Sequence, residues 1–437
     1  MALSFRGGLK LSRAGRFDVP PMESMKASDA VTLPLSQQAG EACVPLVAPG
    51  DRVLKGQKIA SPPDDSAPLF ASVSGRVLSI GTVATDRGEA EAIVLENDHK
   101  GEVSPDVRPF SSPISRVEPE ELVAHIREKG IVDADGVGAP VWKTIEAARD
   151  KAQRLVIHCI ESEPYLSAAH RLLLDKTEEV IGGAKILLRA IGCKKAVFAI
   201  GSDTEDAVEA VQNAVGGSES FGVAVFRDKF PQSDERFLLR ALIGKELKDG
   251  LTPADLGAVV FRAETCWAVY RAFVTGLPMI ERLIAVGGDC VKHPACLVAP
   301  LGVRFSEMLS RCGGCSSAPD RLFSGGPLTG LPVADDTVPL TRLTQAVLAL
   351  RLPEPREESG CIRCGRCVSV CPMRLMPVKL WRAVKNGNYT MCEVFHLEAC
   401  TQCGLCTVVC PAGIPLSDVI AAGKAAFLAA EGGDRNA

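Results

Sequence analysis

Two cysteine arrays near the end of the chain have the spacing of iron–sulfur ligands. Each follows the pattern C-x2-C-x2-C-x3-C-P of bacterial ferredoxins, in which the fourth cysteine of one array binds the cluster held by the other array. Zinc sites usually take their ligands as two separated pairs, so this spacing favours iron. We therefore expect two [4Fe–4S] clusters, the first on Cys361, Cys364, Cys367 and Cys410 and the second on Cys400, Cys403, Cys406 and Cys371.

Such a pair of clusters is suited to moving single electrons. Each cluster would be held by four cysteines, which leaves no open coordination position for a substrate. Cys392 lies between the arrays, and we expect it to be a free thiol. The arrays therefore predict electron transfer between two partners and not substrate chemistry at iron.

Four further cysteines lie upstream of the arrays. Cys312 and Cys315 form a C-x2-C pair that could act as a redox dithiol. Together with Cys290 and Cys296 they could instead bind zinc or a third cluster. The third alternative is four buried free thiols, because cysteine packs readily as a small apolar residue.

Composition limits the class of protein. The 437 residues suggest two to four domains, and 46% hydrophobic and 23% charged residues are typical of a globular chain. A net charge of -4 gives no support to nucleic-acid binding. The cysteine count of 17 is odd, and the start of the chain lacks the apolar stretch of a signal peptide, which indicates the reducing cytoplasm. No apolar run is long enough to span a bilayer.

The hydrophobic pattern divides the chain into parts. Residues 31–100 alternate short apolar stretches with Gly and Pro turns, which predicts β-structure. From about Glu118, helical stretches alternate with apolar strands such as 154–160 and 196–200, which predicts an α/β domain with a largely parallel sheet. Residues 281–350 are mixed in pattern, and a polar linker over 352–360 leads into the cysteine arrays.

The order of these parts resembles the RnfC family, which supplies one component of the Rnf electron-transport complex and is related to the flavoprotein subunit of respiratory complex I. Segments along nearly the whole chain carry the resemblance: Gly7-Gly8-Leu9, Leu35-Ser-Gln-Gln-Ala-Gly40, Glu163-Pro-Tyr-Leu166, Pro278-Met-Ile-Glu-Arg282, Ser324-Gly-Gly-Pro327 and the ferredoxin part from Cys361 to Pro415. Residues 47–77 also resemble biotinyl and lipoyl domains, but the segment 61–68 has no lysine to modify, so we expect a structural module.

The resemblance implies a multidomain α+β fold of four parts. They are a β barrel-sandwich hybrid module over 1–115, an α/β flavin and NADH-type domain over 116–280, a β-grasp module of the soluble-ligand-binding type over 281–350, and a two-cluster ferredoxin domain over 351–437.

In this family, NADH passes a hydride to FMN, and the flavin passes single electrons to the clusters. The resemblance assigns FMN and NADH to a site containing Gly136, Gly138, Glu161, Glu163, Glu235 and Thr265. Asp133 and Asp135 stand where the family has glycines, and carboxylates there would crowd and repel a phosphate. Either a rearranged pocket holds FMN with Arg262 as a new phosphate contact, or the pocket has lost its flavin and serves as a scaffold.

The implied function is relay of electrons from NADH, through FMN if it is retained, and then through two clusters to a redox partner. The expected partners are other Rnf-type subunits, a soluble reductase or a ferredoxin-like protein, with attachment to the cytoplasmic face of the inner membrane through partners only. One alternative is a soluble relative that delivers NADH electrons to a thiol- or selenol-dependent reductase such as proline reductase, through Cys312 and Cys315. Another alternative is an adaptor subunit without a flavin.

Overall fold

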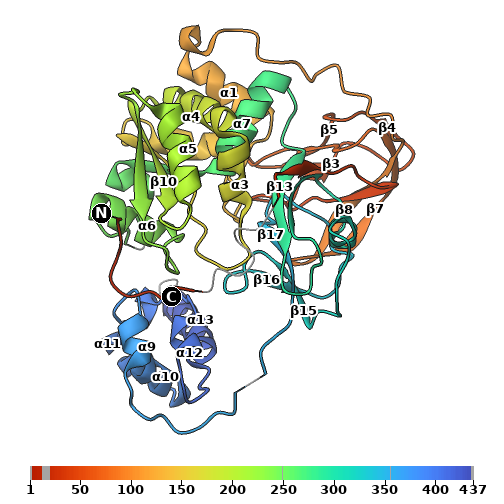
Figure 1. Cartoon of the computed structure of the whole chain (residues 1–437). Coiled ribbons are helices and arrows are strands. Elements are labelled where there is room, and N and C mark those ends of the chain that lie inside the picture. The colour runs from red at the N-terminus through yellow and green to blue at the C-terminus, as the bar shows by residue number, and fades with distance from the viewer. Residues whose placement is uncertain (1, 12–19, 249, 355, 435–437) are drawn as a thin grey trace.

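The protein is a multidomain α+β chain in which sheet-containing parts form one body and a helical domain lies beside it (Figure 1). The computed structural model describes residues 2–11, 20–248, 250–354 and 356–434, and side chains as far as residue 427. Within these residues, no helix has both the length and the apolar character that crossing a bilayer requires.

The first part is a β sandwich of two small sheets, with strand orders β2-β8-β7-β4 and β3-β5-β6. Its strands are β2 (Ala30–Pro34), β3 (Val44–Pro45), β4 (Arg52–Val53), β5 (Lys58–Ser61), β6 (Leu69–Phe70), β7 (Gly75–Thr85) and β8 (Gly88–Asn97). Alternate side chains such as Ile93 and Leu95 enter the core, as in strands with one face buried. The long hairpin β7–β8 turns at Asp86 and Arg87.

The central part is built on a parallel sheet in the order β11-β10-β9-β12, which confirms the predicted α/β arrangement. The strands are β9 (Arg154–His158), β10 (Lys195–Gly201), β11 (Phe221–Phe226) and β12 (Ala258–Arg262). The helices are α1 (Pro119–Glu128), α2 (Val141–Ala148), α3 (Ala168–Asp175), α4 (Thr177–Ile191), α5 (Glu205–Val215), α6 (Glu235–Ile243) and α7 (Ala263–Thr275), with 3-10 turns η1 (Ile114–Arg116) and η2 (Pro253–Leu256). Helices α4 and α7 pack closely, since a Cβ added at Gly183 would lie 1.7 Å from the carbonyl oxygen of Cys266.

The third part is a mixed sheet in the order β1-β14-β13-β17-β15-β16. Its strands are β1 (Glu23–Ser24), β13 (Glu281–Gly287), β14 (Ala295–Pro300), β15 (Arg321–Ser324), β16 (Leu331–Val333) and β17 (Ala346–Leu350), and its helix is α8 (Phe305–Arg311). Along β13, Leu283 and Ala285 join the core of the central part, whereas Ile284 and Val286 join the core of the sandwich. Because both faces of the sheet are buried at its centre, β13, β14 and β17 are almost continuously apolar.

The helical domain follows an extended linker and contains both cysteine arrays (Figure 1). Its helices are α9 (Arg366–Val370), α10 (Pro377–Lys385), α11 (Tyr389–Val394), α12 (Leu405–Val408) and α13 (Leu416–Asp434), with a 3-10 turn η3 (Leu397–Ala399). The start of the chain connects this domain to the central part. Leu3 pairs with Phe226 at the edge of β11, Leu9 pairs with Phe230, and the backbone N–H of Gly8 donates to the carbonyl of Val370 at 2.9 Å.

Candidate functional site

A cavity of about 460 Å3 lies where the central part, the third sheet and the helical domain meet. We call it the central pocket. It is at the carboxyl ends of β9 and β12, the end at which parallel sheets bind ligands. Its charged lining residues are Asp86, Asp135, Glu161, Glu163, Asp234, Glu264, Arg87, Arg262 and Arg282. Six carboxylates face three arginines, so the lining has an excess of negative charge.

Asp133 lies behind the pocket wall, over the N-terminus of α7. Its carboxylate accepts hydrogen bonds from the backbone N–H of Arg262 at 3.2 Å and from the hydroxyl of Thr265. These donors belong to the first turn of α7, where a helix leaves N–H groups without partners and favours an anion. Burial, followed by the charge of Asp135, raises the pKa of Asp133 to about 7.

Asp135 engages the next donors along the same loop. Its carboxylate accepts from the backbone N–H groups of Val137 and Gly138, each at 2.8 Å. Gly138 has a φ of +75°, and a Cβ there would lie 2.5 Å from the side chain of Leu343. Glycine is therefore required at this position for backbone conformation and close packing.

Two glutamates that line the pocket also accept hydrogen bonds from backbone N–H groups. Glu161 accepts from the backbone N–H groups of Ala169 and His170, at 3.1 and 3.2 Å, in the first turn of α3. Glu163 accepts from the N–H groups of Leu328 and Thr329, at 2.7 and 3.2 Å. Both predicted site residues line the pocket, but each already binds backbone donors of this chain.

Asp234 and Glu235 complete the acidic wall at the start of α6. Asp234 caps this helix by accepting from the N–H of Arg236 at 2.9 Å. Burial, followed by the charge of Asp133, raises the pKa of Glu235 to about 7. Arg262 opposes this shift, but Asp133, Asp135 and Asp234 outnumber its single charge.

Arg262 lines the central pocket among acidic neighbours. Its Nη1 lies 3.4 Å from Nδ1 of His158, and its charge is set against the surrounding carboxylates. Arg282 is fully buried, and its Nε has no hydrogen-bond partner among the described side chains. However, Arg282 lies within the electrostatic range of Glu264, Asp133 and Asp135.

The central pocket in this conformation does not fit the phosphate of FMN. A phosphate is normally held by free backbone N–H groups at helix N-termini and by cationic side chains. Here five carboxylates of the chain occupy such donors, and the arginines are outnumbered by acidic groups. Of the predicted site residues, Gly136, Glu161 and Glu163 line the pocket. Gly138, Glu235 and Thr265 lie directly behind it, in contact with lining residues or within their electrostatic range.

The two cysteine arrays pack on one apolar core. Cys371 of the first array lies with Cys400, Cys403 and Cys406 of the second array around a cavity. Burial is the first cause of the raised pKa values of Cys371, Cys403 and Cys406, and neighbouring cysteines of this set raise them further. These four sulfurs around a shared cavity fit a cubane whose fourth ligand comes from the other array.

The remaining four array cysteines differ in burial. Cys361 and Cys367 pack on the same core as the buried Cys410, whereas Cys364 is exposed. Cys392 is buried on α11, in the apolar core of the domain. The ligand set of the first cluster stays a prediction.

The four upstream cysteines do not form one group. Cys296 points toward the central part, with its Sγ 3.5 Å from the Ser167 hydroxyl, whereas Cys290 and Cys312 belong to the core on the other face of the sheet. Cys315 lies beside the segment of Cys290, because the next residue, Val291, forms an antiparallel bridge with Cys315. Burial raises the pKa of Cys312 to about 11, which disfavours the thiolate that a redox dithiol needs. The packing favours buried free thiols.

Two pocket-lining segments had no signal in the sequence. The tip of the β7–β8 hairpin reaches the pocket, where Arg87 donates to the carbonyl of Gly136 at 2.5 Å and Asp86 accepts from the Ser324 hydroxyl at 2.6 Å. Thr401, Gln402 and Cys403 of the second array also line the pocket. A Thr-Asp-Arg-Gly turn can be recognised in the sequence, but its neighbours in space cannot.

The fold and the arrays define a class, namely a two-cluster iron–sulfur protein built on a flavin-type α/β domain. Three family models agree with this: an RnfC barrel sandwich hybrid domain over residues 3–100, a Nuo51 FMN-binding domain over 126–271 and a 4Fe-4S dicluster domain over 360–414. The chain belongs to the RnfC family, which confirms the resemblance and the prediction of a two-cluster domain.

Two relatives show the extent of the similarity. The C-subunit of the Na(+)-translocating ferredoxin:NAD(+) oxidoreductase complex of Acetobacterium woodii is 30% identical, over 85% of each chain. The C-subunit of the proton-translocating ferredoxin:NAD(+) oxidoreductase complex of Clostridium ljungdahlii is 34% identical, over 87% of this chain and 84% of its own. Among solved structures, a chain of an NAD+-reducing [NiFe]-hydrogenase in the H2-reduced state aligns over 75% of this chain and 63% of its own, with 18% identity and a TM-score of 0.48.

Proposed function

We propose that this chain is an electron-transfer subunit of an Rnf-type complex and that it relays electrons from NADH, through FMN if it is retained, and then one at a time through two [4Fe–4S] clusters to a redox partner. Bound clusters would supply one-electron acceptors and donors. The chain itself holds them with Cys361, Cys364, Cys367 and Cys410 in one set and Cys400, Cys403, Cys406 and Cys371 in the other. Because NADH releases two electrons together and a cluster accepts one, a flavin must stand between them; in this conformation carboxylates of the chain occupy the loop amides that would face its phosphate.

One observation carries the proposal: a single cavity is lined by both the nucleotide-type domain and a cluster loop. Thr401, Gln402 and Cys403 share the central pocket with Glu161 and Arg262. An electron donor in this pocket would therefore lie against the second cluster loop, without intervening protein. The N-terminal segment supports this contact, since it bonds to both the central part and the helical domain.

The four-part division belongs to the same proposal. We assign the barrel-sandwich module to 1–115, the flavin and NADH-type domain to 116–280, the β-grasp module to 281–350 and the ferredoxin domain to 351–437. The pairing of β1 with β14 supports a close union of the first and third parts. The proposed partners are other Rnf-type subunits, because relatives are named as subunits of such complexes, and the proposed place is the cytoplasmic face of the membrane, reached through those subunits.

The test is an anaerobic preparation of the full chain. Iron and acid-labile sulfide should be present in amounts that match two [4Fe–4S] clusters. After dithionite reduction, electron paramagnetic resonance should show two interacting [4Fe–4S] signals. A reduced protein without a cubane signal would contradict the proposal.

A further inference from the structure

The two cluster loops have the same backbone but opposite surroundings. Arg363 and Gln402 occupy equivalent positions, with φ values of +58° and +55°. Gly365 and Gly404 follow at +74° and +76°, and each caps the helix after it. Because the backbones match, differences in side chains and in burial distinguish the roles of the two loops.

The second loop is the internal end of the domain. Leu405 is fully buried and packs with Phe230 and Val370, and Cys403 is partly buried against the same apolar cluster. Gln402 and Cys403 line the central pocket. Although Gln402 is exposed, the second loop is therefore more buried than the first.

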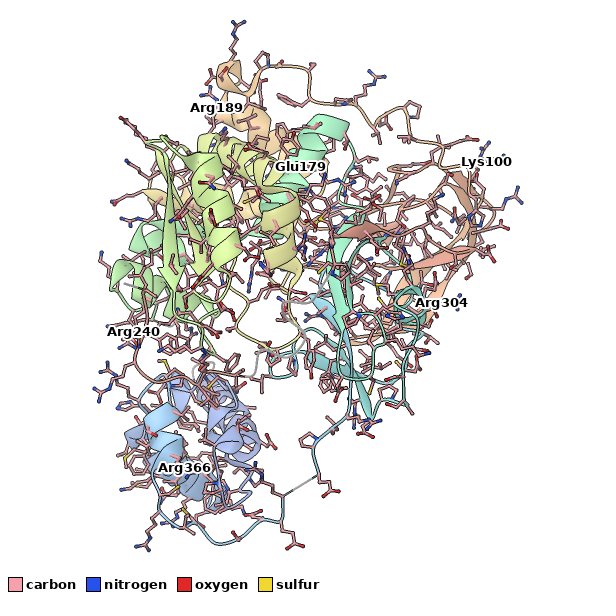
Figure 2. The ribbon with its side chains drawn as sticks, viewed as in Figure 1. Lys100, Glu179, Arg189, Arg240, Arg304 and Arg366 are labelled. Carbon is pink, nitrogen blue, oxygen red and sulfur yellow. The ribbon has the colours of Figure 1, made fainter. Side chains whose placement is uncertain are left out.

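The first loop is the external end. Ile362 is 67% exposed, and Cys364 is exposed between two arginines, Arg363 and Arg366. Arg366 takes the position that buried Leu405 has in the second loop. Figure 2 labels Arg366 on α9 at the surface of the helical domain. Neither guanidinium has a hydrogen-bond or ion-pair partner among the described residues.

Basic residues are concentrated in the part of the sequence that contains the first loop. The stretch from Ser359 to Cys392 contains six basic residues and no acidic one. The basic residues are Arg363, Arg366, Arg374, Lys379, Arg382 and Lys385. Lys385 pairs with Glu358 at 3.7 Å, whereas Arg363 and Arg366 lie without such a partner among the residues that the structure describes, in the same loop as exposed Ile362. This pair of cations favours docking of an acidic protein, because complementary charge steers the encounter and desolvated apolar contact holds it.

We infer that the first cluster loop is the docking surface for an acidic one-electron carrier protein, with Ile362, Arg363 and Arg366 at its centre. This inference rests on the proposed function, since it assumes that the loop holds a cluster. It adds a direction, so that electrons exchange with the central pocket through the second loop and with the carrier through the first.

The test compares the reconstituted full chain with its Arg363→Glu/Arg366→Glu variant. The probes are an acidic [2Fe–2S] ferredoxin and a basic cytochrome c. At low ionic strength, the variant should bind the acidic ferredoxin at least tenfold more weakly in calorimetry and should transfer electrons to it at least tenfold more slowly. The difference should shrink as salt is added, and reduction of cytochrome c should not be slowed.

Arg116→Glu/Arg351→Glu is the matched control, because it makes the same change in charge at exposed arginines outside both cluster loops. It should bind the ferredoxin as the wild-type chain does. Equal binding of the ferredoxin by the Arg363→Glu/Arg366→Glu variant and the wild-type chain would overturn the inference. An equal slowing of electron transfer to the ferredoxin and to cytochrome c would also overturn it. Failure of the proposed function would look different, because a chain without clusters would show no dithionite-dependent resonance signal before any carrier is added.

Discussion

Asp133 Oδ1 lies 3.2 Å from the backbone nitrogen of Arg262, the residue that caps the N-terminus of α7. A carboxylate of the chain thus occupies a position where a helix would attract an external anion. Asp135 does the same for the amides of Val137 and Gly138. These two contacts explain why a domain that matches an FMN-binding family model presents a pocket unsuited to a phosphate.

Removal of these two carboxylates should create affinity for FMN. In an Asp133→Ala/Asp135→Ala variant, the amides of Arg262, Val137 and Gly138 become free and two negative charges disappear. We expect FMN to bind at least tenfold more tightly than to the wild-type chain, measured by quenching of flavin fluorescence. Riboflavin, which lacks the phosphate, should not gain affinity.

The exposed Glu209→Ala variant on α5 is the control for a general loss of charge. Stoichiometric retention of FMN by the wild-type chain would contradict our interpretation of the loop.

The cysteine pairing can be tested by comparing variants of different arrays. Cys371→Ser and Cys403→Ser should lose the same cluster, because these residues lie around one cavity. Cys364→Ser and Cys410→Ser should lose the other. Each variant should retain about half of the iron. The resonance spectra of Cys371→Ser and Cys403→Ser should match each other, and so should those of Cys364→Ser and Cys410→Ser. Cys392→Ala should keep both clusters; four unrelated spectra would reject the crossed assignment.

The raised pKa of Asp133 predicts a pH-dependent stability. Its folded-state pKa is about 7, above the ordinary value of 3.8, so between these values the folded chain binds a proton that the unfolded chain releases. Stability should therefore fall as the pH rises through this window. An Asp133→Asn variant has no carboxyl to titrate at this position, so it should not lose stability in this way. The difference in free energy of unfolding, variant minus wild type, should therefore be larger at pH 8 than at pH 5 by ~1–3 kcal/mol.

Denaturant titrations at both pH values provide the measurement, with exposed Glu209→Gln as the control. If the difference in free energy of unfolding between the Asp133→Asn variant and the wild-type chain does not change with pH, Asp133 is not the titrating group.

Gly183 tests the close packing of α4 on α7. Alanine normally favours a helix over glycine by about 1 kcal/mol. Here its Cβ would overlap the carbonyl oxygen of Cys266, which is backbone and cannot rotate away. Gly183→Ala should therefore lower the free energy of unfolding by roughly 1–3 kcal/mol. Gly222→Ala, where a Cβ meets nothing within 4 Å, should cost little in thermal denaturation.

Much of the fold could be predicted because it depends on local patterns. The apolar strands predicted at 154–160 and 196–200 correspond to β9 and β10 of a parallel sheet. The short helix α2 and the buried sheet pairing of β1 with β14 were not predicted. The reason is that β1 has only two residues and gains its partner from a segment more than 270 positions away in the sequence.

The sequence by itself determined the cluster chemistry, because ligand type and spacing along a short loop are sufficient to define an iron–sulfur array. The family resemblance also placed Asp133 and Asp135 in the flavin loop, but left open whether Arg262 could serve as a new phosphate contact. Only the tertiary structure decided that question, since the charge balance around Arg262 comes from α6, α7 and the loop together. Tertiary contacts also decided which of two nearly identical loops faces the pocket and which faces the solvent.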